Sequence, residues 1–133
     1  MTTDTFRSTF SSDTLAELFP ADLSNQFFEA LYGDADEGAY DISLCFEKEG
    51  EGELFFGLHL VQRAGKCLAC NLTYGLPEVF SRHPLINIKG LVDKIGERMG
   101  ETFDITGWKL GHTREVSREL HIVPLSISFI KKG

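Results

Sequence analysis

One stretch of this chain decides its fold, and it reads Tyr40-Asp41-Ile42-Ser43-Leu44-Cys45-Phe46-Glu47. Apolar and polar residues alternate along it, and this period of two is typical of a strand with one buried face. A second alternating run spans residues 54–60, and a glycine-containing turn at residues 49–52 separates the two. Two such runs joined by a short turn predict an antiparallel hairpin.

A third strand is expected at residues 67–74, after a turn at residues 64–66. If the even-numbered residues of neighbouring strands share the core face, the numbers of paired residues must sum to an even value. A three-residue loop then gives the apolar cross-strand pairs Leu60–Cys70, Leu58–Leu72 and Phe56–Tyr74.

Helical patterns stand before and after these strands. A first helix is predicted over Asp13–Phe19, with Ser12 as its N-cap, and Pro20 interrupts it. A second begins near Asp22 and is closed by Gly33. A short helix follows from Pro77. A longer helix has the apolar stripe Ile88, Leu91, Val92, Ile95 and Met99, with Gly100 as its stop.

Two further strands are predicted at residues 103–110 and 115–130. The fold class is therefore α+β: an antiparallel sheet of about five strands with helices packed on one face, in the order αα-βββ-α(α)-ββ. Residues 1–11 are predicted to be a loose N-terminal arm, and residues 12–133 a single domain. The predicted shared core comprises Leu44, Phe56, Leu58, Leu60, Leu72, Leu91, Val92 and Ile95.

Charge divides the chain into two unequal halves. Residues 1–53 contain thirteen acids and two bases, a net charge of −11, and residues 54–133 contain seven acids and eleven bases, a net of +4, which together give −7. One interpretation is an acidic surface that favours solubility, and the other is an acidic face that receives a basic partner. Nucleic acid is excluded as a partner, because backbone binding needs clustered bases and the bases here stand among acids.

The sequence also predicts a compartment. No apolar stretch approaches the roughly 18 residues that a membrane span needs, and the first residues lack the pattern of a signal peptide. The chain has three cysteines, an odd number, and their spacing does not match a disulfide framework, which fits a reducing environment. We therefore expect a cytoplasmic protein with no membrane partner.

Cys67 and Cys70 are the candidate metal or redox residues. A closed zinc site needs four ligands, and the chain has no second Cys-x-x-Cys motif to supply them. On a strand, residues three apart point to opposite faces about 10 Å apart, too far for a disulfide. We therefore predict no disulfide between them, no bound metal and no cofactor, with Cys70 buried and Cys67 more accessible.

A second cluster of chemically capable side chains lies near the last strand. It comprises His112, Arg114, Glu115, Arg118, Glu119 and His121. Acid, base and arginine together can support catalysis, but alternating charges on a strand are more often a solvated face. No nucleophile or phosphate-loop motif accompanies them, so no catalytic residue is assigned.

The outward face of the predicted sheet offers candidates for partner binding. Odd positions place Phe55, Gly57, His59 and Val61 there, a surface that is small, partly apolar and lightly charged. Such a face is covered either by the N-terminal helices or by another chain. Phe55, His59 and Val61 are the partner-binding candidates, and a homodimer through this face or through an exposed strand edge is predicted.

Three stretches, residues 19–42, 65–84 and 111–121, resemble a small bacterial family of uncharacterised proteins, whose members sometimes carry a homeobox-protein label. A homeodomain needs a basic helix for the major groove, and this chain has none, so the resemblance implies no activity. The order of elements is also similar to that of type III secretion chaperones, which are dimers that bind extended segments of other chains.

The leading functional interpretation is a non-catalytic protein-binding domain, chaperone-like or adaptor-like. The alternatives are a thiol or metal-binding protein that uses Cys67 and Cys70, and a small enzyme with a His/Arg/Glu site near residues 112–121.

Overall fold

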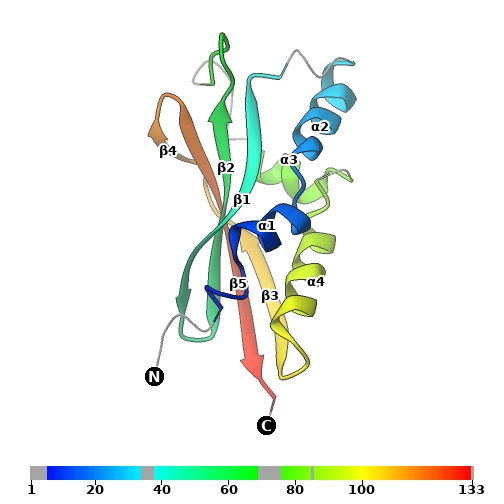
Figure 1. Ribbon diagram of the computed structural model, residues 1–133, viewed down its shortest axis with the longest axis vertical. Coiled ribbons are helices and arrows are strands. Elements are labelled where there is room, and N and C mark those ends of the chain that lie inside the picture. Colours follow the sequence, from blue (N-terminus) through cyan, green and yellow to red (C-terminus); the bar gives the residue numbers. More distant parts are fainter. Residues whose placement is uncertain (1–5, 34–37, 69–75, 85, 133) are drawn as a thin grey trace.

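The computed structural model describes residues 6–33, 38–68, 76–84 and 86–132. Its helices are α1 (Ser12–Leu18), α2 (Asp22–Tyr32), α3 (Leu76–Arg82) and α4 (Ile88–Met99), and its strands are β1 (Tyr40–Gly50), β2 (Glu53–Gln62), β3 (Phe103–Leu110), β4 (Arg114–Ser117) and β5 (Leu120–Lys131). Figure 1 shows these helices gathered on one side of a twisted sheet. The predicted α+β class and the five-stranded antiparallel sheet are confirmed.

The sheet has the order β1-β2-β5-β3, and β4 pairs with the remaining part of β5. The predicted hairpin of β1 and β2 is confirmed, and it pairs Leu44 with Leu58. The predicted partner of β2 is wrong, because β5 pairs with its other side and places Val123 opposite Leu58. Most of the predicted third strand, residues 67–74, lies outside the described residues.

The core lies between the sheet and the helices. Leu44, Phe56, Leu58, Leu60, Leu91, Val92 and Ile95 are all buried in one cluster, as predicted. The remaining member of the predicted set, Leu72, lies outside the described residues. The assignment of even-numbered residues to the core face, on which the core prediction rests, is therefore correct for β1 and β2.

The helix boundaries follow from their capping residues. Ser11, rather than the predicted Ser12, caps α1 by accepting a hydrogen bond from the N–H of Thr14 at 3.3 Å. Gly33 and Gly100 follow the ends of α2 and α4 with positive φ angles of 79° and 97°, which glycine adopts without strain. Both glycines were predicted as helix stops.

The N-terminal segment is packed where the sequence predicts a loose arm. Phe6 is 4% exposed and meets Phe103 edge-on, and Phe10 is 3% exposed and stacks on Phe46. The prediction is wrong for residues 6–10, because two aromatic side chains four residues apart reach the same core from one turn of chain. Residues 1–5 lie outside the described part.

No helix in the described ranges is long and apolar enough to span a membrane.

Candidate functional site

Strand β1 forms one edge of the sheet, and α2 covers only part of it. The hydroxyl of Ser24, on α2, accepts the N–H of Ile42 at 2.7 Å and donates to the C=O of Ile42 at 3.3 Å. Ser24 is fully buried, so this pair of bonds replaces a neighbouring strand at one residue of the edge.

The same bonds establish which way the main chain of β1 faces. The main-chain groups of an antiparallel strand face its two neighbours at alternate residues. Because Ile42 faces outward, Leu44 and Phe46 face outward as well, while Ser43 and Cys45 face β2. In the part of the chain that the structure describes, the outward N–H and C=O of Leu44 have no hydrogen-bond partner.

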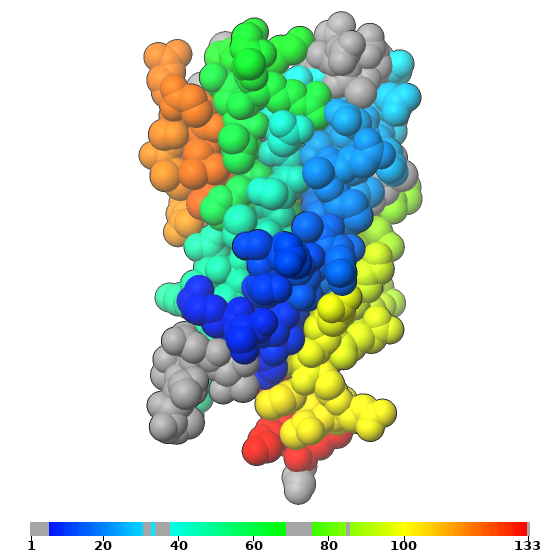
Figure 2. Space-filling model, viewed as in Figure 1, coloured from blue at the N-terminus to red at the C-terminus, as the bar shows by residue number. Residues whose placement is uncertain are grey.

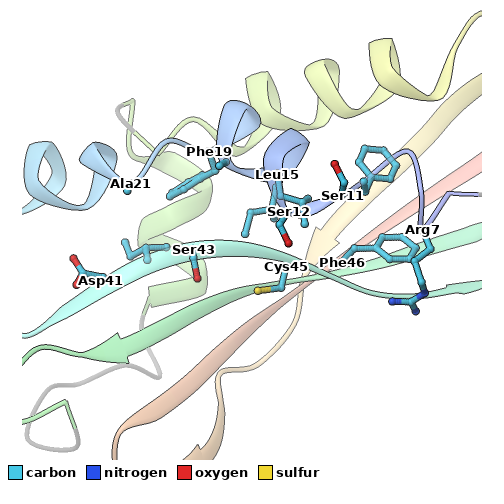
Figure 3. Close-up of a pocket in the computed structure, with 14 residues that line it drawn as sticks. Arg7, Ser11, Ser12, Leu15, Phe19, Ala21, Asp41, Ser43, Cys45 and Phe46 are labelled. Atoms are coloured by element: carbon cyan, nitrogen blue, oxygen red, sulfur yellow. The ribbon is translucent and has the colours of Figure 1, made fainter.

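A pocket of about 700 Å³ lies beside this open edge, between β1 and the N-terminal segment with α1. Phe10, Leu15 and Phe19 give it an apolar wall, and Ala16 lies on its α1 side. Figure 3 shows Leu15 and Phe19 above β1. Figure 2 shows the N-terminal segment and α1, in blue, directly beside the teal β1. We call the pocket and the outward edge of residues 43–46 the β1 groove.

Both ends of the β1 groove are closed by side chains. At one end, Ser24 occupies the edge at Ile42. At the other, the guanidinium of Arg7 donates to the C=O of Glu47 at 3.2 Å and lies over the ring of Phe46, 5.2 Å from its centroid. The open edge between them is therefore only a few residues long.

A polar cluster lies on the opposite side of β1, on the sheet face without helices. It consists of Cys45, Glu47 and His59, and a carboxylate oxygen of Glu47 lies 2.9 Å from Nε2 of His59. The pairing of β1 with β2 shifts between Phe46 and Lys48, which leaves Glu47 as a bulge residue. Cys45 is paired with Gly57 and is half-buried, and Figure 3 shows its sulfur on the side of β1 away from α1.

The cluster makes His59 a cation at neutral pH. Hydrogen bonding with the Cys45 side chain, and then with the Glu47 carboxylate, raises the pKa of His59 from 6.5 to about 9, although burial acts in the opposite direction. Gly57 makes room for this arrangement, because a Cβ at that position would lie 2.6 Å from the Glu47 carboxylate.

The three partner-binding candidates lie on this same face, since Phe55, His59 and Val61 alternate along β2. Val61 is 45% exposed. Phe55 is half-buried beneath the ammonium group of Lys48, 5.1 Å from its ring centroid, and His59 belongs to the polar cluster. The described helices lie on the other face, so none of them covers these side chains (Figure 1).

Cys67 differs from its prediction, because it is disulfide-bonded. The prediction assumed a strand from residue 67 onward. Instead, Cys67 and Leu68 belong to no strand, and the N–H of Leu68 bonds to the Gln62 side chain at 3.0 Å. Cys70 lies outside the described residues. Among the residues described, no three or more His, Cys, Asp or Glu side chains group as a metal site.

Of the cluster predicted near residues 112–121, Glu115 and His121 lie directly opposite each other in the pairing of β4 with β5. His112 is exposed, whereas His121 is 2% exposed and opposite Leu60 in the ladder with β2. Arg114, Glu115, Arg118 and Glu119 are exposed on the β4–β5 hairpin. The strand pairing therefore brings Glu115 and His121 together, and the small-enzyme interpretation stays a prediction.

Local sequence patterns do not predict two features of this candidate site. The β1 groove depends on which strand is left at the sheet edge, and local alternation contains no signal for that. The polar cluster had a partial signal, because Cys45 and His59 both occupy odd positions of adjacent strands. The bulge at Glu47, which places the carboxylate beside His59, had none.

Together, the fold and the groove define an α+β domain in which the β1 edge of the sheet is partly open. Comparisons with protein-family models, with curated proteins and with solved structures found no match.

Proposed function

We propose that this chain is a non-catalytic protein-binding domain that receives a short extended segment of another protein in the β1 groove. The observation that carries the proposal is the outward main chain of Leu44, which lies open beside an apolar pocket of about 700 Å³. An added strand gains its affinity from main-chain hydrogen bonds, and pockets for alternate side chains give it specificity.

The dimensions of the groove favour a slender occupant. Ser24 and Arg7 close its ends, so only a few residues of a partner strand can pair with β1. The edge also lies beside α1, which stands where the bulk of a second globular chain would have to approach (Figure 1). An extended peptide avoids that obstacle, and this interpretation agrees with a chaperone-like or adaptor-like role.

The charges of the neighbouring helices favour a basic segment. Helices α1 and α2 contain Asp13, Glu17, Asp22 and Glu29 and no lysine or arginine, and of these Glu17 is paired with Arg98. The lining of the groove itself has one base, Arg7, and one acid, Asp41. Opposite charges steer encounter and suppress wrong partners more than they add affinity. The proposed occupant is therefore an extended segment with one apolar anchor for the pocket and with Lys or Arg beside it.

A displayed library of random nonapeptides, selected on the immobilised protein, tests this function. The selected peptides are expected to share an apolar residue flanked by bases, and to lose binding when Ala16→Trp fills the pocket. Ala30→Trp is the matched control, because Ala30 is also an exposed helical alanine but does not line the groove. Selected peptides that bind the Ala16→Trp variant as well as the original protein would refute the proposed function.

A further inference from the structure

A second pocket, of about 370 Å³, lies on the sheet face that the described helices leave uncovered (Figure 1). Its floor is apolar and consists of Phe55 from β2 with Ile122 and Pro124 from β5. Pro124 is paired with Gly57 on this face, so neither of these positions carries a long side chain that would fill the hollow. The volume is at the lower end of the roughly 300–1,000 Å³ that is typical of small-molecule sites.

Two cationic side chains reach this pocket from strands on either side of its floor. The ammonium group of Lys48, on β1, lies 5.1 Å from the ring centroid of Phe55, and Arg114 comes from β4. Strand β1 pairs with β2, and β4 pairs with β5, so these two strands flank the apolar floor. Among the residues that the structure describes, neither Lys48 nor Arg114 makes a salt bridge, so both charges can pair with a ligand.

The charges of the lining select a ligand with one negative charge. Lys48 and Arg114 supply two positive charges, and the acid among the described lining residues is Glu47, which leaves one positive charge in excess. The Glu47 carboxylate already contacts Nε2 of His59 at 2.9 Å. Complementary charge favours the right partner and like charge disfavours the wrong one, so a phosphate ester with several negative charges suits this pocket less well than a monoanion does.

We propose that this pocket binds a small monocarboxylate with an aromatic or aliphatic body. The body lies on the floor of Phe55, Ile122 and Pro124, and the carboxylate pairs with Arg114 and Lys48. A planar guanidinium suits this role, because it can donate two parallel hydrogen bonds to one carboxylate. The described residues that line this pocket do not include any that line the β1 groove, so the proposal does not depend on peptide binding there.

An NMR titration of the isotope-labelled protein with naphthoate tests the site, and naphthamide, a neutral analogue of the same shape, is the control ligand. We expect naphthoate to shift the amide resonances of Phe55, Arg114 and Ile122 and to leave that of Leu44, in the β1 groove, unchanged. Naphthamide should bind more weakly, because the apolar floor alone holds it. A second copy of the chain on this face would compete with naphthoate, so the titration is carried to saturation.

Matched variants test the two cations. Arg114→Gln and Lys48→Gln should each lower the affinity for naphthoate by about two- to fivefold, the size of one exposed ion pair, and leave the affinity for naphthamide nearly unchanged. Arg118→Gln removes an exposed arginine of the same hairpin that does not line the pocket, and it should change neither affinity. Ala16→Trp, which fills the β1 groove, should change neither affinity as well. Circular dichroism confirms that the variants fold.

Three results would overturn the proposal. The first is that naphthoate binds the original protein no more tightly than naphthamide does. The second is that a folded protein with both Lys48→Gln and Arg114→Gln binds naphthoate as tightly as the original protein. The third is that naphthoate shifts only resonances of the β1 groove and that Ala16→Trp abolishes these shifts.

Discussion

Gly57 is the residue on which the polar cluster depends, because the absence of a side chain there leaves room on both sides. A Cβ at this position would lie 2.6 Å from the Glu47 carboxylate and 2.9 Å from a methyl group of Ile122. The carboxylate can swing away, since it ends a flexible side chain. Ile122 is 5% exposed and has less freedom to move.

Gly57→Ala should therefore separate Glu47 from His59 and strain the packing of Ile122. We expect a loss of about 1–3 kcal/mol in the free energy of unfolding, typical of overpacking. We also expect the pKa of His59 to fall below about 9, because the hydrogen bond and the charge of Glu47 are lost, and to stay above 6.5, because the Cys45 side chain remains beside the ring. The measurement is an NMR titration of the His59 ring in both proteins, and an unchanged midpoint would contradict this role of Gly57.

Ser24 stabilises the edge of β1 through a single hydroxyl. In Ser24→Ala the N–H and C=O of Ile42 lose their partner in a buried place, and an unsatisfied buried group costs about 1–3 kcal/mol. Urea denaturation measures the change. The control is Ser81→Ala, since the Ser81 hydroxyl is exposed and donates only to the C=O of Glu78. Equal effects of the two substitutions would show that Ser24 does not support the edge.

At the scale of elements, local patterns predicted much of the fold. Alternation in residues 40–46 and 54–60 gave the β1–β2 hairpin and its buried side chains, and capping residues gave the helix ends to within a residue or so. The partner of β2 was not predictable from local pattern. Pairing β2 with β5 joins residues 59 to 75 positions apart, and the choice between two apolar strands depends on the packing of the whole sheet.

Leu58 lies where β1, β2 and β5 meet the helices, opposite both Leu44 and Val123. It is fully buried, so Leu58→Ala should cost about 2–5 kcal/mol in the free energy of unfolding. Val61→Ala on the same strand is the control, because Val61 is 45% exposed, and it should cost under about 0.5 kcal/mol. If Leu58→Ala lowers the free energy of unfolding no more than the control does, the strand faces are assigned wrongly.

At the scale of the whole molecule, the helices cover one face of the sheet and leave Phe55, His59 and Val61 on the other. A second copy of the chain is one possible cover for that face. We predict a homodimer at micromolar concentration that Phe55→Glu weakens, because a carboxylate would be buried in the contact. Analytical ultracentrifugation measures the oligomeric state of both proteins. A monomer over the whole concentration range would contradict the predicted dimer.

The central claim is that the edge of β1 at Leu44 is open and accepts a strand from a partner. Amide hydrogen exchange measured by NMR gives a separate rate for each residue of this edge. In the free protein the amides of Ile42 and Cys45 should exchange slowly, because they donate hydrogen bonds to Ser24 and to β2 respectively. The amide of Leu44 should exchange fast. A selected peptide should slow the exchange of the Leu44 amide and leave the exchange of the Cys45 amide unchanged. Two results would contradict an open edge at Leu44. One is a Leu44 amide that exchanges as slowly as the Cys45 amide in the free protein, and the other is a Leu44 amide whose exchange stays fast when a peptide is bound.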